Sequence, residues 1–231
     1  MSITNASIIN KLLIKHNHTF ASIVDFDKKY ESVLNLDFTA QNTSLTAEII
    51  NNTHLFCEYI NAALLANNAK FGVGGYLEHR TVYARSKHFD GEEGEPRRLH
   101  LGVDIWGNAL TPVYSFMDAK IHSFANNNNF GDYGATIILE HELDEYKFYS
   151  LYGHLSLQSL AGLNKGKEIK KGTHFCDFGV PDENGHWPPH LHFQLMTTMD
   201  GKQGDYPGVG KFSEKELWAN KIPDANLLLR F

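Results

Sequence analysis

Residues 188–195, which have the sequence PPHLHFQL, carry the most information in this chain. Side chains alternate between the two faces of a β-strand, so His190, His192 and Gln194 are expected on one face and the apolar residues that follow each of them on the other. Two imidazoles on one face with an apolar reverse predict a strand that is anchored in a core and displays nitrogen ligands into a groove. A polar stripe on an exposed strand would give the same local pattern.

Short β-rich runs extend outward from this strand along the chain. Turn-forming residues separate them, such as the four asparagines at 126–129 and the run DENG at 182–185. Many short strands with few helices predict an antiparallel sheet or a small barrel-like sandwich. The predicted strands are residues 81–84, 101–105, 112–116, 119–124, 134–140, 147–152, 173–178 and 190–196.

The N-terminal part of the sequence has a more helical pattern. Residues 46–67 carry apolar side chains at helical spacing and predict an amphipathic helix that begins near Thr46. Residues 5–15 predict a short helix, and residues 21–24 and 33–38 predict short strands.

Near residue 72 this helical pattern ends, and a Gly-rich segment leads into the short β-rich runs described above. We therefore expect an N-terminal extension at 1–71, a catalytic domain at 72–200 and a C-terminal extension at 201–231 that packs on the core. The predicted fold class is α+β: a mainly antiparallel sheet or barrel-like catalytic domain with a helical N-terminal extension.

The composition is that of an ordinary globular protein. Apolar residues make up 42% of the 231 residues and the net charge is −6, which does not favour nucleic acids or anionic lipids as partners. The N-terminus lacks the features of a secretory signal, and no stretch approaches the ~20 apolar residues of a membrane helix. We expect no nucleic-acid partner, no membrane insertion and a cytoplasmic location, or a periplasmic or extracellular one if an export signal had been removed. No sequence feature indicates an oligomeric state.

Cys57 and Cys176 are the two cysteines of the chain. Neither has the close Cys or His neighbour that a redox or zinc-knuckle site needs, so both are expected to be buried free thiols.

Two further segments carry candidate site residues. Residues 97–107, RRLHLGVDIWG, contain His100 and Asp104, and residues 148–156, FYSLYGHLS, end an apolar strand at a glycine that presents His154. Taken singly, the first pair also fits ordinary surface or capping residues, and a lone His at a strand end also fits a hydrogen-bonded structural residue.

Taken together, the three segments resemble the lysostaphin-like (LytM-type) zinc endopeptidases, a family that includes peptidoglycan-cleaving enzymes. The family signature is HisXxxXxxXxxAsp followed much later by HisXxxHis. The resemblance covers residues 98–196 and includes the landmarks HLGVDIWGNALTPV, YGATIILEH, LYGHLS and NKGKEIKKG in the family's order.

Carried over by position, the resemblance implies that His100, Asp104 and His192 bind Zn²⁺ and that His154 and His190 are catalytic histidines beside it. Two neutral imidazoles and a carboxylate with an open fourth position are the pattern of a catalytic zinc site. The resemblance thus implies a zinc metallopeptidase that hydrolyses a peptidoglycan fragment or another short peptide with a metal-activated water. One catalytic histidine is expected to take a proton from that water, and the other to stabilise the oxyanion or protonate the leaving amine.

Other functions fit parts of the sequence. A non-catalytic peptide-binding or regulatory module of the same fold is the main alternative, although all five site residues are present. A biotinyl- or lipoyl-carrier domain is suggested only by GKEIKKG at 166–172, which lacks the exposed lysine where such a cofactor attaches.

Two regions depart from the family pattern. The run Trp187-Pro188-Pro189 replaces the small Gly- and Thr-rich turn usual before the last histidines, and it is expected to stiffen and narrow the groove. Residues 1–70 match no wall-binding module and are expected to cover or regulate the groove.

The remaining candidate groups are interpreted as structural or solvated. The run at 75–80 is expected to be a solvated turn rather than to place Glu78 or Arg80 at the groove mouth, and the acidic residues at 90–95 are expected to form a solvated hairpin. Other histidines are expected to be surface or hydrogen-bonded residues, with His186 the best placed of them to line the groove. These are His79, His88, His122, His141, His174 and His186.

Overall fold

The computed structural model describes residues 5–90 and 94–231. The helices are α1 (Asn5–Lys15), α2 (Ala47–Asn51), α3 (Thr53–Ala66) and α4 (Lys215–Lys221). The strands are β1 (Val33–Asn35), β2 (Phe71–Gly74), β3 (Arg97–His100), β4 (Val103–Trp106), β5 (Pro112–Tyr114), β6 (Ala119–Asn127), β7 (Gly134–Leu143), β8 (Tyr146–Leu155), β9 (Glu168–Ile169), β10 (His174–Asp177), β11 (His190–Met196) and β12 (Val209–Lys211).

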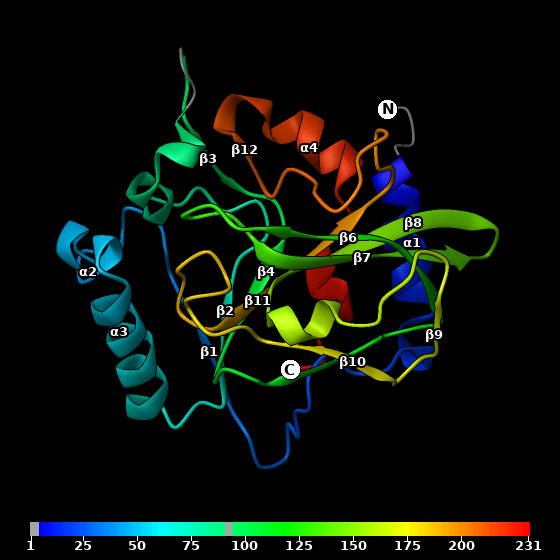
Figure 1. Cartoon of the computed structure of the whole chain (residues 1–231), viewed down its shortest axis with the longest axis horizontal. Coiled ribbons are helices and arrows are strands. Elements are labelled where there is room, and N and C mark those ends of the chain that lie inside the picture. The colour runs from blue at the N-terminus through cyan, green and yellow to red at the C-terminus, as the bar shows by residue number, and fades with distance from the viewer. Residues whose placement is uncertain (1–4, 91–93) are drawn as a thin grey trace.

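Eight of these strands form one sheet in the order β1-β2-β4-β11-β8-β7-β6-β9 (Figure 1). Neighbouring strands are antiparallel except β1 and β2, which are parallel. Helices α2 and α3 lie at one side of the sheet and α1 at the opposite side. The predicted α+β class with a mostly antiparallel sheet and a helical N-terminal extension is confirmed. Among the described residues, no helix is both long enough and apolar enough to cross a membrane.

Strand β11 has the alternation that the sequence predicts. Leu191, Phe193 and Leu195 belong to the largest apolar core, which also contains Ile9 and Leu13 of α1. His190, His192 and Gln194 are buried too, but each of them makes a side-chain hydrogen bond. The strand is therefore anchored through its apolar face and presents its polar face to the site.

A second apolar cluster joins the N-terminal helices to this site. Phe56, Ile60 and Leu64 of α3 pack in one cluster with Trp106 of β4 and Trp187. The helical extension and the strands with the candidate ligands thus share one packed layer.

Several predicted elements differ from the structure. The helix predicted at 46–67 is two helices, because Asn52 is extended and its side-chain oxygen accepts hydrogen bonds from the N–H groups of His54 and Leu55, capping α3. The strand predicted at 81–84 is wrong, since the 3₁₀ helix η2 (Val82–Arg85) lies there. Only Val24 of residues 21–24 makes a β-bridge, and the strand predicted at 33–38 ends at Asn35.

Two smaller expectations have mixed outcomes. Both cysteines are free, but Cys57 is only half-buried, whereas Cys176 is buried as expected. The solvated hairpin expected at residues 90–95 falls in part outside the described residues.

Candidate active site

Strand pairing brings the three predicted ligands together. His192 of β11 is the direct antiparallel partner of Asp104 of β4, and His100 ends β3. His100 Nε2 lies 3.0 Å from His192 Nδ1 and 3.2 Å from Asp104 Oδ1, and His192 Nδ1 lies 3.0 Å from that same oxygen. All three residues are at most 3% exposed. They form a compact triangle of one oxygen and two nitrogens.

The hydrogen-bond partners of the two imidazoles show where their protons are. His100 Nδ1 lies 2.8 Å from the carbonyl of Gly75, which can only accept, so the proton is on Nδ1 and Nε2 is bare. Gln194 Nε2 donates to the carbonyl of Pro207, which turns its Oε1 toward His192 Nε2, 3.0 Å away. His192 therefore carries its proton on Nε2, and its Nδ1 is bare.

Three lone-pair atoms with no proton between them consequently face one another. Such an arrangement is repulsive unless a cation lies among them. Tetrahedral Zn²⁺ with bonds of about 2.0–2.1 Å sets its ligand atoms about 3.3 Å apart, close to the observed separations of 3.0–3.2 Å. The outward N–H of each histidine is also held by an acceptor, as is usual for metal-binding histidines. The residues present fit zinc.

His154 is held beside this triangle by an unusual backbone. It follows Gly153, which pairs with His192 across β8 and β11, and its φ is +62°, a left-handed conformation that is uncommon for histidine. Its N–H donates to the carbonyl of Tyr133 at 2.7 Å, and its Nδ1–H donates to the carbonyl of Asn184 at 2.7 Å. The second bond leaves Nε2 without a proton.

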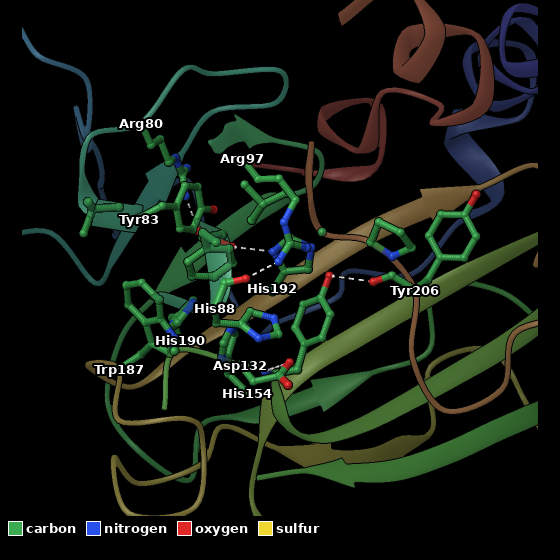
Figure 2. A pocket seen from close by; sticks show the side chains of 18 of the residues that line it. Arg80, Tyr83, His88, Arg97, Asp132, His154, Trp187, His190, His192 and Tyr206 are labelled. Carbon is green, nitrogen blue, oxygen red and sulfur yellow. Dashed lines mark hydrogen bonds and ion pairs between the residues drawn. The ribbon is translucent and has the colours of Figure 1, made fainter. Parts of the chain in front are cut away.

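His190 has the same protonation pattern. Its Nδ1–H donates to the carbonyl of Pro188 at 2.8 Å, so its Nε2 is bare. The ring stacks on Trp106 with centroids 3.9 Å apart and on His154 with centroids 4.1 Å apart. Figure 2 shows His154, His190, His192 and Trp187 grouped around one cavity.

Burial controls the charge of these histidines. It lowers the pKa of His190 to about 4, and burial together with the neighbouring His190 holds the pKa of His154 well below its usual value. Both rings are therefore neutral at pH 7 and can accept a proton on Nε2. Burial opposes the ionisation of Asp104, but the Arg80 guanidinium that donates to it holds the pKa of this carboxyl well below its usual range.

Arg80 is the largest departure from the expected site. The solvated turn predicted at 75–80 is wrong for this residue, which is 1% exposed. Its Nη1 donates to Asp104 Oδ2 at 2.5 Å, and its Nε donates to Glu78 Oε2 at 2.6 Å. Nothing in the local sequence signals this, because the partner lies on another strand.

A cavity of about 250 Å³ opens beside the histidines. Its lining includes Asp104, His154, His190 and His192, together with Tyr83 and Trp187. Val82, Tyr83, His88 and Phe89, which precede the predicted family segment, form part of its wall. Sequence reasoning missed His88 as a lining residue.

The other histidines follow the interpretation given to them, with one further difference. His186 does not line the cavity, and its ring stacks on Phe130 with centroids 5.5 Å apart. His122, His141 and His174 hydrogen-bond to neighbouring side chains.

A buried cluster of two imidazoles and a carboxylate on an antiparallel sheet, with two neutral histidines beside it, defines a metallopeptidase-type site. Residues 98–205 match the profile of peptidase family M23, and all five site residues lie in that segment. Over this segment the chain is similar to peptidase family M23, which confirms the resemblance predicted from the sequence.

Solved structures similar to this chain include peptidases. A zinc-containing peptidase from Vibrio cholerae is 27% identical with a TM-score of 0.34, and the match covers 42% of this chain and 27% of that one. The catalytic domain of lysostaphin from Staphylococcus simulans is 23% identical with a TM-score of 0.38, covering 68% of this chain and 96% of that one. LytU is 21% identical with a TM-score of 0.36, covering 57% and 79%. This chain thus spans about a quarter of the Vibrio cholerae peptidase. No curated protein matches the sequence.

Proposed function

We propose that this protein is a zinc-dependent metalloendopeptidase that hydrolyses amide bonds in short peptides of the peptidoglycan type. The observation that carries the proposal is the triangle of His100 Nε2, Asp104 Oδ1 and His192 Nδ1. Its three unprotonated atoms lie 3.0–3.2 Å apart, and a cation between them would offset their mutual repulsion. The family match over residues 98–205 supports a peptidase rather than another metal-binding protein.

In this proposal His100, Asp104 and His192 hold the zinc, which lowers the pKa of water and polarises the amide carbonyl when it is bound. His154 and His190 are neutral and carry bare Nε2 atoms, so one of them accepts the proton of the attacking water. The other donates a hydrogen bond or a proton toward the oxyanion or the leaving amine once it is itself protonated.

The cavity supports a peptide as the substrate. Trp187 and Tyr83 give it an aromatic wall beside the histidines. Aromatic side chains of this kind can pack against a peptide backbone with small side chains.

The test is cleavage of muropeptides and of simple Gly- or D-amino-acid-containing peptides by zinc-loaded protein, compared with a His192→Ala variant. The proposal predicts cleavage by the wild type, loss of bound zinc in the variant and loss of its activity. His174→Ala is the matched control, because His174 is exposed and bonds only to Asp177 among the described side chains. Peptide binding without cleavage would instead favour the non-catalytic module of the same fold.

A further inference from the structure

Arg80 reaches the metal triangle from outside the family segment. Strand β2 pairs with β4 so that Gly74 lies opposite Asp104, and the chain then turns back along β3. In this return His100 N–H donates to the carbonyl of Glu78, and Arg80 N–H donates to the carbonyl of Arg98, both at 2.8 Å. The backbone of residues 74–80 is therefore fixed against the strand that ends in His100.

The guanidinium divides the two oxygens of Asp104. Arg80 Nη1 donates a hydrogen bond to Asp104 Oδ2 at 2.5 Å. The other oxygen, Oδ1, lies 3.2 Å from His100 Nε2 and 3.0 Å from His192 Nδ1. Arg80 Nε donates to Glu78 Oε2 at 2.6 Å, and the guanidinium carbon lies 5.1 Å from the centre of the Phe38 ring. These contacts leave the buried guanidinium little freedom to turn away from Asp104.

The packing of Gly74 also depends on this position of Arg80. A Cβ atom at Gly74 would lie only 2.4 Å from Arg80 Nη2. The residue opposite Asp104 in the sheet thus has no side chain, and the guanidinium fills the space. The neighbouring Gly75 carbonyl orients His100, so one short turn holds two of the three ligands.

A carboxylate can bind a cation through one oxygen or through both, and binding through both adds a ligand atom. We propose that Arg80 is a positioning residue that restricts Asp104 to binding the metal through Oδ1 alone, which keeps one coordination position open for water. The inference rests on the proposed metal site. It extends the functional site to residues that precede the family segment.

The test uses Co²⁺ in place of zinc, because four-coordinate Co²⁺ absorbs visible light more strongly than five-coordinate Co²⁺. The double variant Glu78→Gln/Arg80→Gln removes the guanidinium without changing the net charge, and Glu78→Gln alone is its matched control. We expect the control to keep the intense wild-type spectrum and the double variant to lose intensity. Equal spectra for the three proteins at saturating Co²⁺ would overturn the inference.

Gly74→Ala is a milder second variant in case the double variant fails to fold, as judged by circular dichroism. It keeps every charge but displaces the guanidinium, so the same loss of intensity is expected, and an unchanged spectrum would count against Arg80. Failure of the proposed function can be told apart from failure of the role of Arg80. In the first case, wild-type protein would bind no more Co²⁺ than the His192→Ala variant does. Wild type that binds Co²⁺ and cleaves peptide, with spectra unaffected by these changes, would refute only the role of Arg80.

Discussion

His154 combines a left-handed backbone with a bare Nε2 beside the metal triangle. Its φ of +62° is held by hydrogen bonds to the Tyr133 and Asn184 carbonyls. Uncommon backbone conformations of this kind persist where the surroundings enforce them, and they gather at functional sites. The residue is therefore suited to a test that separates its chemistry from its structural role.

His154→Asn provides that test. Asparagine tolerates the left-handed region, so the variant is expected to unfold at nearly the wild-type temperature and to bind zinc as wild type does. Loss of the proton-accepting ring should lower kcat about 10²–10⁴-fold. The measurements are peptide cleavage, zinc content and thermal unfolding. A variant that keeps its zinc and stays within tenfold of wild-type kcat would remove His154 from the proposed mechanism.

His141 predicts a pH dependence of stability away from the candidate site. Its Nε2 accepts from the Ser150 hydroxyl at 2.6 Å, and burial lowers its pKa to about 4. Below about pH 6.5 the unfolded chain takes up a proton here that the folded chain does not, so this group lowers the free energy of unfolding as the pH falls toward 4. The loss reaches about 1.4 kcal/mol per pH unit.

His141→Gln should reduce this acid sensitivity. Between about pH 7.5 and pH 5, metal-free wild type should lose about 2 kcal/mol more stability than the variant. Urea unfolding of both proteins at the two pH values measures the difference, with His174→Gln as the exposed control. Parallel losses in wild type and His141→Gln would show that this ring is protonated in the folded protein as readily as in the unfolded one.

The sequence predicted much of the candidate site, but not all of it. The five residues that it indicated converge because each lies in or beside a strand, and strand alternation and pairing are regular. Arg80 was not predictable, because its partner Asp104 is 24 positions away and is reached only after β2 pairs with β4. Its own run, GYLEHR, has the polar composition of a solvated turn.

At the level of elements, the loop before β11 connects two parts of the site. The Asn184 carbonyl holds His154, and the carbonyl of the adjacent Gly185 accepts from Gly131 N–H at 2.9 Å. The φ of Gly185 is +84°, and a Cβ atom there would lie 1.9 Å from the Asp132 carbonyl oxygen. Any side chain at this position must displace one of the two loops.

Gly185→Ala is therefore expected to be costly. Steric overlap with backbone adds to the left-handed conformation, and together they should lower the free energy of unfolding by roughly 2 kcal/mol or more. Gly172→Ala is the matched control, because Gly172 also has a positive φ, +75°, but its Cβ would meet no atom within 4 Å. Its cost should be about 1 kcal/mol. Urea unfolding measures both variants, and equal costs would mean that the two loops separate freely.

The elements differ in how far their sequences determined them. β11 matches its predicted range because polar and apolar side chains alternate along it, and this alternation is specific to a strand that packs one of its faces on the core. Residues 81–84 were assigned wrongly because Val82 and Tyr83 are both buried, and an apolar pair this short fits a strand or a 3₁₀ turn equally well. The break between α2 and α3 depends on one capping side chain, Asn52, within an otherwise helical pattern.

For the molecule as a whole, the sheet extends beyond the family segment. β1 and β2 continue it past β4, and the turn after β2 supplies Gly75 and Arg80. Single-sequence patterns did not predict this, because the pairing of short strands far apart in the sequence depends on tertiary packing. The predicted α+β class followed from local patterns, whereas the connection between the N-terminal part and the site required the assembled sheet.

Metal removal tests this assembled site as one unit. A ligand that binds only the folded state raises the free energy of unfolding by about 2.7 kcal/mol at one hundred times its Kd, and 1 kcal/mol shifts Tm by about 2–4 °C in a chain of this size. Zinc should therefore raise the Tm of metal-free protein by roughly 5–10 °C, and a chelator should reverse the rise. His192→Ala should lose the shift, because its two remaining ligands, on β3 and β4, no longer connect to β11. The same rise in that variant would place the stabilising zinc elsewhere on the molecule.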